Sequence, residues 1–169
     1  METRCEIKDF PLRHTLSVRA QVSTMKLGKI FGKTYEYIIK YLQKNNIEPI
    51  EFPYSKYFGA DWDRMAKLKG FRKFWFIMTR KWDIEIGFII PEPDKGSGDI
   101  QPGTIKNSQA IYATHIGPYQ KVGKTYEDIL QWATQQGCQL ADHSYEFYQN
   151  DPTTTPAAEL RTEIVIPLL

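Results

Sequence analysis

Alternating and helical patterns of hydrophobic residues follow one another along the first half of this chain. His14–Val22 alternates apolar and polar residues, which predicts a half-buried strand. Lys26–Asn46 places apolar residues on one side and lysines on the other at helical spacing, which predicts an amphipathic helix. Two extended segments, Ile50–Phe58 and Trp82–Ile90, follow the helix. The first half is therefore predicted to contain a strand, a helix and two further strands.

The second half of the chain has the same order of patterns. Gln109–His115 is predicted to be a strand, and a Gly-Pro pair separates it from a helix that ends near Gln136. Gln139–Gln149 and Leu160–Leu168 are the predicted extended segments after this helix. The intervening residues 92–108 are rich in Pro, Gly, Asp and Ser, which predicts a mobile linker between the halves. The apolar run Phe74–Thr79 fits an extended segment and a helix equally well.

A repeated motif supports a duplication. Gly-Lys-Thr-Tyr-Glu at residues 32–36 recurs at residues 123–127, an offset of 91 positions. The same offset gives eight identities over the 27 positions from 32 to 58, and the matches beyond the motif are Ile38/Ile129, Tyr54/Tyr145 and Tyr57/Tyr148. Glu85 and Glu163 match at an offset of 78, so the first half carries an insertion of 91 − 78 = 13 residues, placed within 59–81. Two copies predict a closed pseudo-twofold domain with its cleft on the symmetry axis, because a solenoid needs at least three units.

Length and composition predict one domain over residues 1–169, with a first repeat at about 14–91, a linker at 92–108 and a second repeat at about 109–168. The net charge of +2 gives no global argument for nucleic acid or an anionic membrane. Cys5 and Cys138 have no metal-ligand spacing, and no apolar run has the length of a signal peptide or membrane span. We therefore expect a cytoplasmic protein without a cofactor, metal or membrane partner.

Two motif-based hypotheses fail on spacing. A phosphate-binding loop needs a glycine five residues before the glycine of Gly-Lys-Thr, and Leu27 and Pro118 occupy those positions. The three histidines, at positions 14, 115 and 143, have no spacing typical of a metal site.

A pair of carboxylates is the strongest candidate chemistry. Glu85 and Glu163 lie at matching places in the last strand of each half, and strand alternation puts both on the side opposite the apolar residues. Tyrosines recur near both. A carboxylate among aromatic rings suits a lipophilic cation, and its burial is expected to raise the pKa. The alternative is that both glutamates are solvated strand residues.

The second half resembles the GyrI-like small-molecule-binding domain, also called the AraC-type effector-binding domain, which is associated with transcription regulation and multidrug binding. The resemblance rests on four motifs in order: Tyr112-Ala-Thr-His-Ile-Gly-Pro-Tyr119, Gly123-Lys-Thr-Tyr-Glu-Asp-Ile129, Tyr148-Gln-Asn-Asp-Pro152 and Glu159-Leu-Arg-Thr-Glu163-Ile-Val-Ile-Pro167-Leu168. The first half, with Asp83-Ile-Glu85-Ile-Gly87-Phe88, resembles the family's less regular repeat. The resemblance implies an α+β fold: two strand-helix-strand-strand units, an antiparallel sheet with two helices on one side, and a central ligand cleft.

The resemblance also implies a binding site for lipophilic cationic or planar aromatic compounds. Carried over to this sequence, Glu163 is the expected floor of the site, and Tyr112 and Tyr148 are its expected lining. The remaining candidate ligand-binding residues are Trp82, Glu85, Tyr145 and Tyr54. Only some thirteen residues precede the first predicted strand, which leaves no room for a helix-turn-helix, so we expect a stand-alone domain that does not contact nucleic acid directly.

Three functions fit these residues. The first is a sensor or sequestering protein that binds its ligand without chemistry. The second is a hydrolase of strained, cyclopropane-bearing xenobiotics, with Glu163 as general base and Tyr112 or Tyr148 as proton donor. The third is a protein inhibitor of a topoisomerase-type enzyme, which would use the lysine-rich side of the first helix. Exposed strand edges also fit a homodimer or another protein partner.

Overall fold

The computed structural model of this protein describes residues 3–68 and 70–169. Eight strands form one antiparallel sheet in the order β1-β6-β8-β7-β3-β4-β2-β5. The strands are β1 (Cys5–Phe10), β2 (Arg13–Ser23), β3 (Tyr54–Tyr57), β4 (Lys81–Ile90), β5 (Gln101–Ile105), β6 (Ser108–Ile116), β7 (Ser144–Tyr148) and β8 (Arg161–Pro167). The helices are α1 (Leu27–Lys44), α2 (Trp62–Lys67), α3 (Gly70–Thr79) and α4 (Val122–Gln136), with short 3-10 turns η1 (Thr24–Lys26), η2 (Tyr119–Lys121) and η3 (Ala157–Glu159). The predicted α+β fold with an antiparallel sheet is confirmed.

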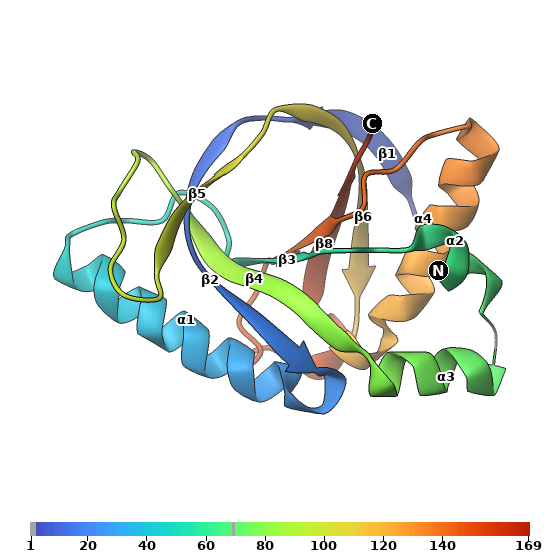
Figure 1. Cartoon of the computed structure of the whole chain (residues 1–169), viewed down its shortest axis with the longest axis horizontal. Helices are drawn as coiled ribbons and strands as arrows, with labels where there is room; N and C mark the ends of the chain where they lie inside the picture. Colours follow the sequence, from blue (N-terminus) through green and yellow to red (C-terminus); the bar gives the residue numbers. More distant parts are fainter. Residues whose placement is uncertain (1–2, 69) are drawn as a thin grey trace.

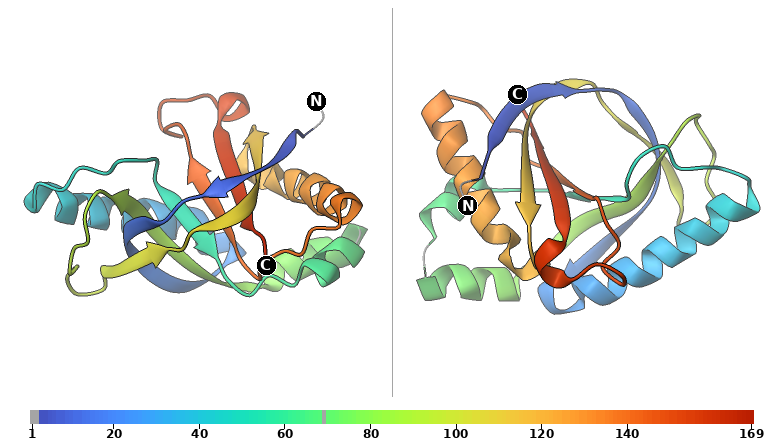
Figure 2. Two further views of the ribbon diagram at one scale, coloured as in Figure 1. Left: turned by 90° about the horizontal axis from the view of Figure 1, so that it is seen from above. Right: turned by 180° about the vertical axis from the view of Figure 1, so that it is seen from behind.

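The sheet is strongly curled, and α1 and α4 pack against its outer side (Figure 1). α1 contacts β2 and β4, whereas α4 contacts β6. Both further views show the same arrangement, with the two long helices outside the curl (Figure 2). We call the side of the sheet that faces α1 and α4 the helix face, and the opposite side the inner face.

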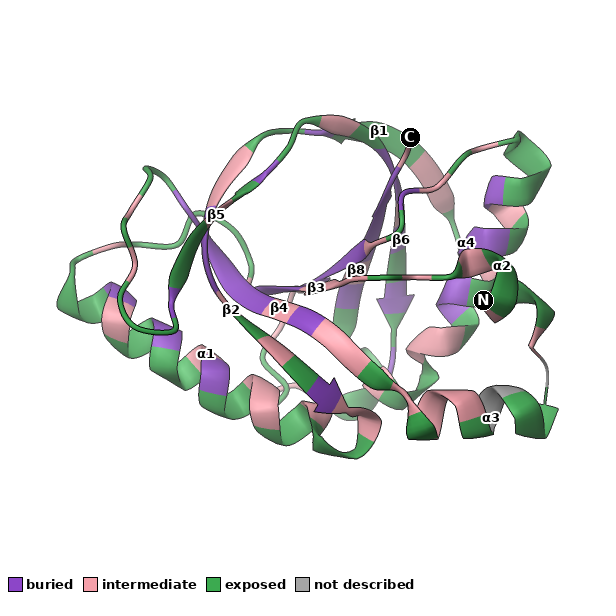
Figure 3. Ribbon diagram, viewed as in Figure 1, coloured by how far each residue is buried: buried purple, intermediate pink, exposed green. Residues whose placement is uncertain are grey.

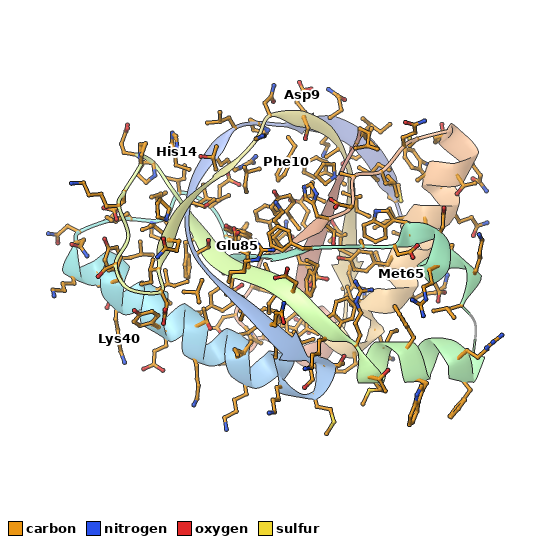
Figure 4. All side chains as sticks on the ribbon, viewed as in Figure 1. Asp9, Phe10, His14, Lys40, Met65 and Glu85 are labelled. Atoms are coloured by element: carbon orange, nitrogen blue, oxygen red, sulfur yellow. The ribbon has the colours of Figure 1, made fainter. Side chains whose placement is uncertain are left out.

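The long helices follow the predicted hydrophobic patterns. In α1 the buried residues are Thr34, Ile38 and Leu42, which face the sheet, and the opposite side is exposed (Figure 3). Lys40 points away from the sheet on this exposed side (Figure 4). α4 buries Tyr126, Ile129 and Ala133 among others, and it ends at Gly137, whose φ of 68° is a left-handed conformation that glycine adopts without strain. Burial of one apolar stripe therefore places each helix.

The duplication has its axis between β3 and β7. These strands pair in the middle of the sheet with Ser55 directly opposite Glu146. The same two residues are also equivalent in the repeat, because 146 − 55 = 91. A pair of residues that are at once opposite and equivalent lies on the twofold axis. Both side chains are buried. The axis therefore meets the sheet at Ser55 and Glu146.

Four strands differ from the sequence-based expectation. Residues 92–108 include β5, which pairs with β2 at one sheet edge, and β1 pairs with β6 at the other. The sequence of β5 shows no strand-like hydrophobic pattern because it contains Pro102 and Gly103. An edge strand tolerates the proline, and at Gly103 an added Cβ would lie 2.6 Å from Thr15 Oγ1. The ambiguous apolar run lies in a helix, α3. Strands β3 and β7 are shorter than the predicted extended segments.

The inner face has its own hydrophobic core. Its buried cluster contains Phe10, Tyr54, Ile89, Ile105, Ala110, Tyr145, Phe147 and Val165. Phe10 points into the interior of the curl, whereas its neighbour Asp9 points outward to solvent (Figure 4). The curl therefore lets both sides of the sheet bury aromatic side chains.

Candidate ligand-binding site

Glu146 is a buried carboxylate at the centre of the helix face. It lies on β7, next to the pseudo-twofold axis, and only 6% of its surface is exposed. Its Oε1 accepts a hydrogen bond from the Tyr126 hydroxyl of α4 at 3.0 Å, and its Oε2 accepts one from the Tyr148 hydroxyl at 3.1 Å. Among the side chains that the structure describes, no lysine, arginine or histidine forms an ion pair with it. Within the described part of the chain, Glu146 is therefore buried with hydroxyl donors but without a counter-charge.

Burial sets the protonation of Glu146. Desolvation raises the pKa of the carboxyl to about 6, and hydrogen bonds from Tyr126, Tyr148 and Tyr57 limit the rise. Burial also raises the pKa of these tyrosines, and the nearby Glu146 carboxylate adds to the effect. At neutral pH the site therefore combines an ionised carboxylate with neutral tyrosine hydroxyls.

A network of hydroxyls surrounds the carboxylate. The Tyr148 hydroxyl lies 2.7 Å from Ser55 Oγ on the partner strand, and the Tyr126 hydroxyl lies 3.0 Å from Ser144 Oγ. The Tyr35 hydroxyl of α1 donates to the Tyr54 carbonyl at 2.9 Å. These bonds fix the tyrosines of both helices against β3 and β7. They hold the helix face together where the two helices approach the axis.

Aromatic rings close the site. The Tyr148 ring is contacted by those of Phe31 and Tyr35 from α1 and Tyr119 from η2, at centroid distances of 5.9, 6.4 and 5.6 Å. On the α4 side, Trp62 of α2 stacks on Tyr126 at 6.1 Å and 20°. The Trp62 Nε1 donates to the Ala141 carbonyl at 2.6 Å, which fixes the indole in this position. The α2 segment thus covers one side of the site.

The repeated motif supplies two of these tyrosines. Tyr35 and Tyr126 are the tyrosines of the two Gly-Lys-Thr-Tyr-Glu copies, and each projects from its helix toward the central strands. Thr34 and Thr125 of the same motifs are buried. The motif therefore serves the helix-to-sheet contact at the axis rather than a phosphate loop.

The predicted carboxylates lie on the inner face. Glu85 accepts a hydrogen bond from the buried Tyr54 hydroxyl at 2.6 Å. Half-burial raises the pKa of Glu163, and the cations Lys8 and Arg13 oppose the rise. Lys56 is paired in register with Glu85 and lies over the Tyr145 ring at 5.2 Å. Both glutamates thus have cations in their surroundings.

The sheet divides the seven residues predicted for the site into two sets. Glu163, Glu85, Tyr112, Tyr145 and Tyr54 belong to the inner face, whereas Tyr148 and Trp82 belong to the helix face. Glu163 is in register with Phe147, so the adjacent Tyr148 points to the other side. The hypothesis that Tyr148 assists Glu163 in hydrolysis is corrected by this geometry. Tyr112 shares the inner face with Glu163.

Glu146 was not among the residues predicted from the sequence. Alternation along β7 puts Ser144, Glu146 and Tyr148 on the helix face, and Tyr145 and Phe147 on the inner face. A glutamate at a core-facing position of a short aromatic strand was a usable signal. It was obscured because the position equivalent to Glu146 is Ser55, so the repeat comparison showed no identity there.

The surface elsewhere offers an open hollow of about 920 Å³ along α4 and the end of β6, with Glu163 and Tyr112 among the residues that line it. Its lining mixes exposed polar side chains with apolar ones such as Ile116 and Trp132, and it contains no buried charge. Within the described residues, no group of three or more His, Cys, Asp or Glu side chains is placed to hold a metal ion. No helix in that part of the chain combines the length and apolar character needed to cross a bilayer.

Comparison with protein-family models identifies the family to which the chain belongs. Residues 78–169, more than half of the chain, match the model of the GyrI-like small molecule binding domain. The chain therefore belongs to the GyrI-like family of small-molecule-binding domains. No curated protein sequence matches the chain.

Solved structures share the fold at low sequence identity. The EcmrR C-terminal domain is 20% identical with a TM-score of 0.68, and the match covers 100% of this chain and 99% of that one. EcmrR in a complex with DNA is also 20% identical with a TM-score of 0.73, but the match covers 98% of this chain and only 57% of EcmrR. SAV2435 bound to tetraphenylphosphonium is 13% identical with a TM-score of 0.64, covering 100% and 94% of the two chains. A hydrolase from Listeria innocua is 12% identical with a TM-score of 0.63, covering 99% and 93%.

Proposed function

We propose that this protein binds lipophilic organic cations on the helix face, between α1 and α4, with Glu146 as the counter-charge. It acts as a sensor or sequestering protein for such compounds. The observation that carries the proposal is the burial of Glu146 among tyrosine hydroxyls, with no cation paired to it among the described side chains. This assigns the charge-recognition role to Glu146 in place of the glutamate expected from the sequence.

The electrostatics of Glu146 favour a cationic ligand. An ionised carboxylate out of contact with water has lost its hydration, and hydrogen bonds from neutral hydroxyls replace that only in part. A ligand cation would supply the missing charge. Aromatic ring faces would add about 0.5–2 kcal/mol each, and the rings of Phe31, Tyr35, Tyr119 and Tyr148 gather here.

The walls favour a lipophilic ligand of aromatic character. The surroundings of Glu146 are tyrosine and phenylalanine rings, with Trp82 packed on Tyr57 at 5.7 Å further out. SAV2435, a protein of the same fold, has been solved with tetraphenylphosphonium, a cation surrounded by phenyl groups. That similarity supports the proposed ligand class through the fold.

Entry of a ligand requires movement of aromatic side chains, because rings fill the space above Glu146. Tyr148, Tyr119 and Phe31 are only partly buried and form the outer layer. Rotation of these rings would expose the carboxylate while leaving the strands unchanged. The closed arrangement is then the ligand-free state.

Hydrolysis is a second candidate function at the same place. A carboxylate with a pKa of about 6 is suited to act as general base near neutral pH, and the Tyr126 and Tyr148 hydroxyls are hydrogen-bonded to it as proton donors. A protein of the same fold is a hydrolase. In a hydrolase of this kind, Glu146 takes the role of general base that was predicted for Glu163 from the sequence.

Calorimetric titration with tetraphenylphosphonium tests the proposal. We expect wild type to bind, and Glu146→Gln to lose about 2 kcal/mol or more of binding free energy, roughly thirtyfold in affinity. Glu163→Gln is the matched control on the inner face and should bind like wild type. Equal binding by wild type and Glu146→Gln would contradict the proposal, and a loss confined to Glu163→Gln would move the site to the inner face. Bound compounds with hydrolysable rings are then incubated with the protein and analysed for products.

A further inference from the structure

One buried hydroxyl near Glu146 has no hydrogen-bond partner in the described part of the chain. Thr162 lies on β8, is 0% exposed, and its Oγ1 is unpaired among the described residues. Buried polar groups are nearly always paired, because the loss of water is otherwise uncompensated. An unpaired hydroxyl beside a proposed ligand site therefore requires an explanation.

The side chains next to Thr162 already have other hydrogen-bond partners. In register it is paired with Tyr148 of β7 and His115 of β6, so the three side chains lie side by side on the helix face. The Tyr148 hydroxyl is engaged by Glu146 and Ser55. His115 Nε2 lies 3.2 Å from the Pro118 carbonyl, to which it donates, and its Nδ1 lies 2.8 Å from Thr125 Oγ1. Neither neighbour is available to Thr162.

The equivalent position in the first half is apolar. At the offset of 78, Thr162 corresponds to Ile84, which is also 0% exposed and is paired with Tyr57 as Thr162 is with Tyr148. The duplicated fold thus accepts an aliphatic side chain at this place. The hydroxyl of Thr162 is therefore not required by packing.

We propose that Thr162 and Glu146 form the two polar points of one binding site, and that Thr162 hydrogen-bonds a polar substituent of the bound cation. Both residues lie beside the Tyr148 side chain, so displacement of that ring exposes the two groups together. The ligand class becomes narrower: a planar aromatic cation that carries an amino or hydroxyl group. The inference rests on the proposed function and adds a specificity residue to it.

Two probes separate this proposal from general cation binding. Tetraphenylphosphonium carries a charge and apolar rings but no hydrogen-bonding group, whereas ethidium is a planar cation with aromatic amino groups. Thr162→Val removes the hydroxyl with little change of shape, and Thr162→Ser keeps it. Affinities of wild type and both variants for both probes are measured by titration, and the melting temperatures of the ligand-free proteins are recorded.

We expect Thr162→Val to bind ethidium roughly fivefold more weakly and tetraphenylphosphonium within twofold of wild type. Thr162→Ser should keep the ethidium affinity within twofold. Ligand-free Thr162→Val should melt no lower than wild type, because the Thr162 hydroxyl that it removes has no partner among the described residues.

Several outcomes overturn the proposal. Equal weakening of both probes by Thr162→Val would indicate a shape effect, and no weakening would show that the hydroxyl does not contact the ligand. A lower melting temperature of Thr162→Val would reveal an internal partner. Wild type that binds tetraphenylphosphonium but not ethidium refutes this inference alone, whereas wild type that binds neither also refutes the proposed function.

Discussion

The two faces of the sheet carry similar residues in different electrostatic settings. On the helix face, Glu146 is buried among tyrosines without an ion pair in the described structure. On the inner face, Glu85 has Lys56 beside it in register, and Glu163 lies in the field of Lys8 and Arg13. The residue types alone do not distinguish the two faces. The balance of charge around each carboxylate does, and the proposed function rests on that difference.

This difference in charge explains why burial of a carboxylate affects stability differently on the two faces. An uncompensated carboxylate destabilises the ligand-free protein, and a ligand cation relieves that cost. For a carboxylate with nearby lysine and arginine side chains, these cations already offset part of the cost of burial. Substitutions that change the charge on each face test whether the two environments differ in this way.

Charge reversal should give the largest contrast. Glu146→Lys buries an ammonium in a place that offers only hydroxyls and rings, so we expect it to lower the free energy of unfolding by about 3–5 kcal/mol. Glu163→Lys places the same charge at a half-buried position and should lower it by about 1 kcal/mol. Urea unfolding followed by circular dichroism measures both. Equal losses would mean that the two carboxylates have the same environment.

Neutralisation of Glu146 should stabilise the ligand-free protein. Its pKa is about 6 in the folded chain, against 4.5 for an ordinary glutamate, so the folded state holds the proton more tightly than the unfolded state. Stability from this group is therefore greatest below pH 4.5 and is lost as pH rises through 6. Glu146→Gln should gain up to about 2 kcal/mol at pH 7, and the gain should disappear below pH 4.5. Unfolding curves across this range would contradict the assignment if the gain were independent of pH.

Cation binding should weaken in acid. Glu146 must be ionised to act as a counter-charge, and with a pKa of about 6 most of it is protonated at pH 5. The affinity for tetraphenylphosphonium should therefore fall about tenfold between pH 7 and pH 5. Titration of Glu146→Gln over the same range is the control and should show no such fall. A wild-type affinity that stays constant would exclude Glu146 as the ligand's counter-charge.

Loss of a single hydroxyl should give the smallest effects. Tyr126→Phe removes a hydrogen bond to Glu146, and Tyr54→Phe removes one to Glu85. Each should lower the free energy of unfolding by about 1 kcal/mol. Only Tyr126→Phe should raise the pKa of Glu146 further, which carbon-13 titration of the labelled carboxyl detects. A shift of that pKa in Tyr54→Phe would show that the two faces are coupled.

The sequence predicted the architecture well because burial patterns and the repeat are both visible in it. The alternation in His14–Val22 and the amphipathic pattern of Lys26–Asn46 correspond to β2 and α1 within a few residues. Strands β1 and β5 were missed, because each is an edge strand stabilised by its neighbour's backbone rather than by its own hydrophobic pattern.

The candidate site was predicted only in part, because the strand register decides on which face of the sheet each side chain lies. Tyr148 was chosen from the sequence and lies beside Glu146, but Glu163 lies on the other side of the sheet. Alignment of the two repeats selects, as candidate site residues, those that are identical in both halves. Glu146 and Thr162 differ from their counterparts Ser55 and Ile84, and that asymmetry is where the chemistry of the helix face resides.

The position of the pseudo-twofold axis has a further consequence for ligand tolerance. Since the axis passes between Ser55 and Glu146, a cation centred there meets a tyrosine from each helix on either side, Tyr35 and Tyr126. In the proposed site, a ligand whose charge lies on the axis and that has no polar substituents would meet similar aromatic contacts in two orientations related by a half-turn, which would add orientational entropy to binding. A ligand that pairs with Thr162 is confined to one of them. If the proposed site is correct, the same frame would combine broad acceptance of simple cations with a defined pose for substituted ones.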